Sequence, residues 1–103
     1  MLFQLTMFPT VKSNRAGSSK AVARVIDLID RSGLPYKLGP MSTTIEGDWD
    51  EVMALINKAR LRLRREYPRL YISITIDDRV GAKKRITGKI ESVEKRLGRK
   101  VSR

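Results

Sequence analysis

Residues 70–77 read Leu-Tyr-Ile-Ser-Ile-Thr-Ile-Asp, and this stretch has the clearest periodicity in the chain. Apolar side chains occupy every second position, and polar side chains or tyrosine occupy the positions between them. Because successive side chains of a strand point to opposite faces of a sheet, the alternation predicts a strand that is buried on one face only. We therefore expect the chain to fold around a sheet that has one buried apolar face and one open polar face.

Five further elements and a C-terminal helix are predicted around this strand. Alternation and β-propensity predict strands over residues 2–8, 35–38 and 42–46. Apolar spacing of three and four predicts helices over residues 19–31, 48–66 and 86–97. Ser18 or Ser19 is expected to cap the first helix, Gly33 to end it, and Asp48 with Glu51 to start the second.

The resulting order is β-α-β-β-α-β followed by a helix. Two amphipathic helices of this spacing pack naturally on one face of a four-stranded antiparallel sheet. We therefore expect an α+β fold of the ferredoxin-like βαββαβ sandwich type, with a C-terminal helix added. A chain of 103 residues is one domain, residues 1–103, in which residues 82–103 form a basic helical appendix and tail.

Strand parity separates the buried side chains from those on the open face. The predicted buried set is Phe3, Leu5, Met7, Ile45, Leu70, Ile72, Ile74 and Ile76. The predicted open-face set is Gln4, Thr6, Thr44, Glu46, Tyr71, Ser73, Thr75 and Asp77. Hydroxyls and carboxylates on an open sheet face suit a subunit contact or a small polar ligand, so Thr44, Glu46 and Asp77 are candidate binding residues.

The composition excludes several classes of function. The chain has no cysteine and no histidine, so thiolate metal sites, disulfides and the commonest general base are all excluded. Nothing in it resembles a membrane-spanning run or a signal peptide, and we expect a cytoplasmic protein without a membrane partner. A non-enzymatic binder without a cofactor or metal is the expected class.

The net charge of +11 is confined to the second half of the chain. Residues 1–57 hold six basic and six acidic residues, whereas residues 58–103 hold 16 basic and five acidic ones. Such an excess can bind phosphate backbones. The alternative function is therefore a nucleic-acid-binding or scaffolding module that acts through Lys58–Arg65 and the C-terminal tail.

Other proteins with the same order of elements fit this sequence less well. RNA-binding domains need aromatic side chains on their central strands, where this chain has Gln4, Thr6, Thr44 and Glu46. An acylphosphatase-like phosphate loop would use Asn14 and Arg15, but it lacks the glycine-rich cradle. A metal site at Glu46, Asp77 and Asp78 is disfavoured because alternation sends the two aspartates to opposite faces.

Several short motifs together resemble the small thiamine-binding protein family. The spine of the resemblance is Ser32-Gly-Leu-Pro-Tyr-Lys-Leu-Gly-Pro-Met41, Thr43, Ile45-Glu-Gly47, Asp48-Trp49 and Ile76-Asp-Asp-Arg79. It extends over roughly residues 2–97. It implies a ferredoxin-like domain that binds thiamine or its hydroxymethylpyrimidine part and forms homodimers or homotetramers by sheet pairing.

The resemblance also implies that Ser19, Thr43, Glu46 and Arg79 are ligand-binding positions. A carboxylate such as Glu46 can satisfy the amino and ring-nitrogen edge of an aminopyrimidine. Strand parity sends Thr43 toward the helices and Thr44 toward the open face, so either a bulge intervenes or Thr43 is structural. Arg79 has two possible roles, a ligand contact or an ion pair with Asp77 or with a neighbouring subunit.

Overall fold

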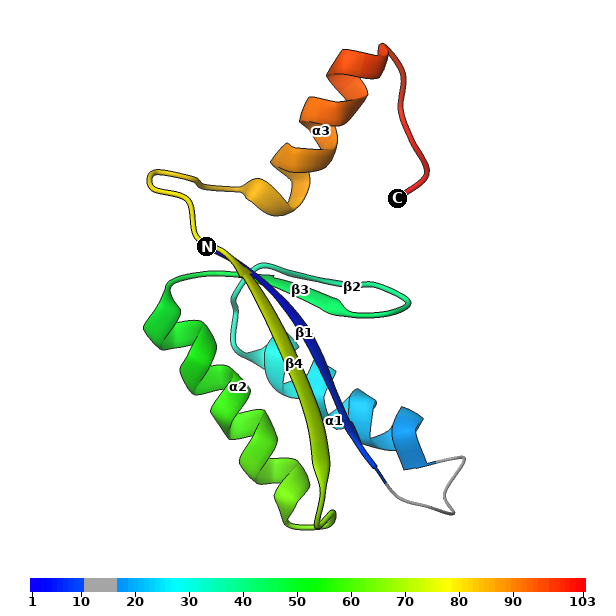
Figure 1. The fold of residues 1–103 in the computed structure, drawn as a ribbon, viewed down its shortest axis with the longest axis vertical. Coiled ribbons are helices and arrows are strands. Elements are labelled where there is room, and N and C mark those ends of the chain that lie inside the picture. The colour runs from blue at the N-terminus through cyan, green and yellow to red at the C-terminus, as the bar shows by residue number, and fades with distance from the viewer. Residues whose placement is uncertain (11–16) are drawn as a thin grey trace.

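The computed structural model of the chain describes residues 1–10 and 17–103 (Figure 1). Its elements are β1 (Leu2–Pro9), α1 (Gly17–Arg31), β2 (Tyr36–Leu38), β3 (Thr43–Glu46), α2 (Trp49–Arg64), β4 (Leu70–Asp77) and α3 (Arg85–Leu97). The four strands form one antiparallel sheet in the order β2-β3-β1-β4. The predicted βαββαβ order and its C-terminal helix are confirmed.

The register of the central strand confirms the predicted division into two faces. Gln4 of β1 lies opposite Thr44 of β3 and Thr75 of β4, and all three belong to the predicted open-face set. Phe3 lies opposite Ile45 and Ile76 on the other face. No position is skipped in either ladder, so the alternation seen in the sequence carries directly into the sheet.

Helices α1 and α2 cover the apolar face of the sheet and enclose the core. The largest side chains with less than 2% exposure are Phe3, Ile29, Ile45, Val52 and Leu63. They come from β1, β3 and both helices, so removing them from water holds the two layers together. Leu70, Ile72, Ile74 and Ile76 of the edge strand β4 pack against this core but stay partly exposed.

The helix boundaries confirm two of the three predicted signals. Gly33 ends α1 in the left-handed region with φ 79°, a conformation that glycine adopts without a steric penalty. At the start of α2, the Glu51 carboxylate accepts the Asp48 N–H at 3.0 Å. The predicted cap of α1 is wrong, because the helix already begins at Gly17 and includes both Ser18 and Ser19.

Helix α3 lies beyond the end of the sheet where β1 begins and β4 ends (Figure 1). Its main contact with the sandwich is with β3. Glu94 is its buried residue, whereas Val93 and Leu97 keep 52% and 48% of their surface exposed. Among the described residues, no helix is both long and apolar enough to cross a membrane.

Candidate functional site

A groove of about 600 Å³ opens where β3 leads into α2, and we call it the Glu46 groove. One wall carries the carboxylates of Glu46, Asp48 and Glu51. The segment that leads into α3 supplies Lys83 and Lys84. Apolar lining comes from Met1, Leu34, Pro35, Tyr36 and Ile86. The groove therefore combines an apolar surface with acidic and basic groups, as small-ligand sites do.

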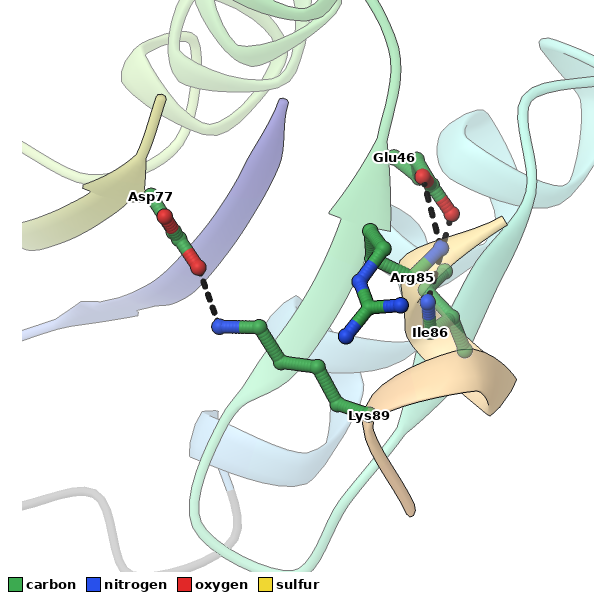
Figure 2. A network of polar contacts seen from close by, with 5 residues as sticks. All are labelled: Glu46, Asp77, Arg85, Ile86 and Lys89. Atoms are coloured by element: carbon green, nitrogen blue, oxygen red, sulfur yellow. Dashed lines mark hydrogen bonds and ion pairs between the residues drawn. The ribbon is translucent and has the colours of Figure 1, made fainter. Parts of the chain in front are cut away.

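Glu46 caps helix α3 from a different element of the fold (Figure 2). Its carboxylate oxygens accept the N–H groups of Arg85 at 2.9 Å and Ile86 at 3.3 Å. The first N–H groups of a helix have no partner within the helix and favour a negative charge. Lys84, at the N-cap position, makes no capping side-chain hydrogen bond to a described residue, and Glu46 takes over that role.

The position of Glu46 corrects the expectation that it lies on a freely open sheet face. It has the parity of Thr44, as predicted, but it is only 9% exposed because α3 covers it. Each carboxylate oxygen has two acceptor positions, so the two N–H contacts leave acceptor capacity for a ligand. A ligand at Glu46 would therefore be in direct contact with the start of α3.

Asp77 provides the second polar contact between the sheet and α3. Its carboxylate forms an ion pair with Lys89 on the second turn of the helix (Figure 2). The Lys89 ammonium lowers the pKa of Asp77 through its hydrogen bond and its charge, and Arg79 and Arg85 lower this pKa further. Asp77 is therefore engaged by the protein itself, with three cations around it.

Thr43 and Thr44 lie on opposite faces of the sheet, and no bulge separates them. Thr43 lies opposite Leu5, is 6% exposed, and lines a cleft between α1 and the β2–β3 loop. Thr44 lies on the open face between Gln4 and Lys37. Thr44 therefore shares the face of Glu46, whereas Thr43 belongs to a different surface.

Ser19 and Arg79 lie in two further places. Ser19 is exposed in a groove between α1 and β2 that also contains Val22, Ile26 and Tyr36. Arg79 is exposed in the loop after β4. The structure thus brings Glu46, Asp77 and Arg79 to the α3 end of the sheet, and it leaves Ser19 and Thr43 outside that group.

Tyr36 separates the Ser19 groove from the Glu46 groove and lines both. Its hydroxyl donates a hydrogen bond to the Asp30 carboxylate at 2.8 Å. This hydrogen bond, together with desolvation and the negative charge of Asp30, raises the pKa of Tyr36. The contact ties the edge strand β2 to α1 and fixes the wall between the two grooves.

Sequence reasoning missed two features of the surface. Lys83 and Lys84 line the Glu46 groove, and the spacing of the sequence contains no signal that would place them there. Phe8 stacks on Tyr71, with ring centroids 5.0 Å apart. The parity of Phe8 with Gln4 and Thr6 was the signal for this pair on the open face.

The described residues provide no support for the alternative phosphate loop or for a metal site. The phosphate loop that would use Asn14 and Arg15 lies outside them. Residues 1–10 and 17–103 contain no group of three potential metal ligands. In the basic run Lys58–Arg65, Arg62 pairs with Glu66 and Arg60 hydrogen-bonds to Asn57. The exposed cations of this run are Lys58, Arg60, Arg64 and Arg65.

The chain is similar to proteins of one small family. The family model described as "Thiamine-binding protein" matches residues 3–94. A UPF0045 protein of Mycobacterium bovis is 37% identical over 82 residues, which are 79% of this chain and 80% of the relative.

Two solved structures show the same fold. A hypothetical protein of Methanocaldococcus jannaschii superposes with a TM-score of 0.79 at 25% identity, over 89% of this chain and 93% of that one. A Thermotoga maritima protein, assigned provisionally to thiamine biosynthesis or salvage, superposes with a TM-score of 0.77 at 25% identity, over 89% and 96% of the two chains.

Proposed function

The chain belongs to the thiamine-binding protein family, and on that premise we propose that it is a non-enzymatic binder of thiamine or its hydroxymethylpyrimidine part. We place the ligand in the Glu46 groove. The family is established by the match over residues 3–94. The ligand and its location are inferences from the chemistry of the groove.

The observation that carries this proposal is the acidic wall of the groove beside an apolar surface. Glu46, Asp48 and Glu51 offer carboxylates to a cationic ring or to a protonated aminopyrimidine. Leu34, Pro35 and the other apolar lining residues offer a surface on which a flat heterocycle can lie. Thiamine combines both chemistries, because an aminopyrimidine is linked to a thiazolium cation.

Calorimetric titration tests this proposal directly. Thiamine and hydroxymethylpyrimidine are titrated into the wild type, Glu46→Gln and Asp48→Asn, with Glu91→Gln on the exposed surface of α3 as the matched control. We expect both groove variants to weaken thiamine binding and the control to leave it unchanged. Asp48 is exposed, so its variant keeps the test valid if Glu46→Gln disturbs α3. Absence of thiamine and pyrimidine binding by the wild type at millimolar ligand would exclude the proposal.

We also propose that the protein assembles into homodimers or homotetramers through its open sheet face. Tyr71 is 52% exposed there and stacks on Phe8, on the same face as the exposed Gln4 and Thr75. Aromatic side chains are enriched in subunit contacts relative to the rest of the surface. Light scattering on the wild type and on Tyr71→Glu tests this: we expect an oligomer that the variant dissociates. A monomeric wild type at micromolar concentration would exclude it.

A further inference from the structure

Residues 79–84 lie between β4 and α3, and Arg85 is the first residue of α3. We call the positively charged segment 79–85 the basic loop. It contains four cations and no acid, and its cationic residues are Arg79, Lys83, Lys84 and Arg85. A hollow of about 240 Å³ is lined by Arg79, Lys83 and Arg85 together with the short segment Val80–Ala82. Three cationic side chains thus surround one small, largely polar depression.

The backbone of the basic loop holds these side chains in a compact arrangement. The Ala82 N–H donates to the Arg79 carbonyl at 3.2 Å, and Gly81 between them has φ 75°. This is the geometry of a tight turn with glycine at its third position. Lys84 is also left-handed, with φ 54°, which turns the chain again before α3 begins. The two turns fold the segment back on itself and gather its charges.

Two acidic groups near the loop already have partners, and a third, Asp78, is exposed next to Arg79 in the chain. Asp77 pairs with Lys89, and Glu46 accepts two N–H groups from the first turn of α3. Arg79 and Arg85 lie close enough to Asp77 to lower its pKa, but the ion pair of Asp77 is with Lys89. The Nε atom of Arg85 is buried and has no hydrogen-bond partner among the described residues. A guanidinium has five N–H donors, so burial of Nε leaves the terminal amino groups of Arg85 as its donors to an anion.

The hollow adjoins the Glu46 groove, because Ala82 and Lys83 line both. The groove contributes the carboxylates of Glu46, Asp48 and Glu51, and the hollow contributes the cations of the basic loop. A ligand that carries a cation at one end and an anion at the other would match both sides. Guanidinium and ammonium groups bind phosphate oxygens by charge-assisted hydrogen bonds, which are among the strongest in proteins.

We propose that the basic loop is a phosphate-binding site, and that the protein takes phosphate esters of its cationic heterocycle in preference to the free alcohol. The heterocycle lies in the Glu46 groove, a placement that rests on the function proposed above. The phosphate or diphosphate lies in the hollow and accepts hydrogen bonds from Arg79, Lys83 and Arg85. Thiamine diphosphate is the probe that combines both chemistries.

Calorimetry with three probes tests this inference. Thiamine, thiamine diphosphate and inorganic pyrophosphate are titrated into the wild type and the double variant Arg79→Gln/Lys83→Gln. Lys95→Gln/Arg99→Gln is the matched control, because it removes the same charge from exposed positions near the end of α3. Arg79→Lys/Lys83→Arg keeps the charge of the loop, and circular dichroism verifies that every variant is folded.

We expect the wild type to bind thiamine diphosphate at least about tenfold more tightly than thiamine, because charge-assisted hydrogen bonds add to the heterocycle contacts. The preference should shrink with added salt, disappear in Arg79→Gln/Lys83→Gln, and persist in the control and in the charge-conserving variant. Equal affinity for the two thiamine forms would overturn the phosphate site and leave the proposed function intact. Equal losses in both charge-removing variants would also overturn it.

The two proposals can fail separately. Binding of pyrophosphate that the loop variant abolishes would support the phosphate site. If thiamine does not bind in the same experiments, the heterocycle proposal is excluded. If pyrophosphate and thiamine diphosphate both fail to bind the wild type, the phosphate site is excluded. Binding of an oligonucleotide at the loop with no binding of pyrophosphate would replace a small-molecule site by a nucleic-acid contact.

Discussion

The sandwich and helix α3 are attached to the same sheet by different forces. The sandwich encloses apolar side chains with almost no exposure, such as Phe3 and Ile45 at 0%. Helix α3 leaves Val93 and Leu97 half-exposed and is joined to the sheet by Glu46 and by the Asp77–Lys89 pair. We therefore expect the sandwich to depend little on pH and salt, and the attachment of α3 to respond to charge, ligands and salt.

Truncation in the core should have the largest effect and should distinguish the two parts most clearly. Phe3→Ala removes a fully buried ring, and we expect it to lower the free energy of unfolding by about 3–5 kcal/mol. Val93→Ala on α3 removes a half-exposed side chain and should change it by no more than about 0.5 kcal/mol. Urea denaturation followed by circular dichroism measures both. Similar losses of unfolding free energy in the two variants would show that the sandwich and α3 are held by the same forces.

Loss of the cap charge at Glu46 should destabilise α3 and spare the sandwich. Glu46→Gln replaces charge-assisted hydrogen bonds to Arg85 and Ile86, and we expect local opening of α3 to become about 1–3 kcal/mol easier. Amide hydrogen exchange across residues 85–97 measures this, with core amides as an internal reference. The control is Glu91→Gln, an exposed carboxylate on the same helix. Unchanged protection of α3 in Glu46→Gln would show that the cap contributes nothing.

Acidification should weaken the second contact of α3. The Lys89 ammonium lowers the pKa of Asp77 below its ordinary range, so the carboxylate stabilises the folded state above its unfolded pKa. That stabilisation disappears as the pH falls through the lowered folded pKa. An NMR titration should show the pKa of Asp77 moving back up in Lys89→Gln and staying low in Lys95→Gln. An unchanged pKa in Lys89→Gln would exclude the ion pair in solution.

The Tyr36–Asp30 hydrogen bond within the sandwich should have the smallest effect on stability. The pKa of Tyr36 is raised by the hydrogen bond to Asp30, so the contact stabilises the fold below the ordinary tyrosine pKa. The contribution disappears as the pH rises through the raised folded pKa. Ultraviolet titration of the three tyrosines should show one that ionises late, and Tyr36→Phe should remove that step. If Tyr36→Phe removes a tyrosine that ionises early, the hydrogen bond to Asp30 is absent in solution.

The sheet and its core were predictable because their signals are local. Alternation in residues 70–77 placed β4 at the observed bounds, and the parity of Gln4, Thr44 and Thr75 placed them on one face. Gly33 and the Asp48–Glu51 pair marked helix ends through backbone chemistry that involves only neighbouring residues. Each of these features depends on residues a few positions apart, which a sequence displays directly.

The site was only partly predictable because its parts come from distant segments. Parity placed Glu46 on the correct side of the sheet, but periodicity cannot show that α3 folds over it and occupies its carboxylate. The same holds for Lys83 and Lys84, which enter the groove from the loop before α3. The assignment of Ser19 and Thr43 as ligand-binding residues beside Glu46 stays a prediction from the family resemblance. The structure places these two residues in other grooves.

The cap of α3 has a consequence for the order in which the chain folds. Glu46 precedes Arg85, whose N–H group it accepts, by 39 positions, so α3 obtains its cap from a strand of the sheet. A helix of 13 residues is marginal by itself in water, and Lys84 supplies no substitute cap among the described residues. We therefore expect α3 to form last, after β1 and β3 have paired and positioned Glu46. Its appearance in a refolding experiment would then report that the sheet is already complete.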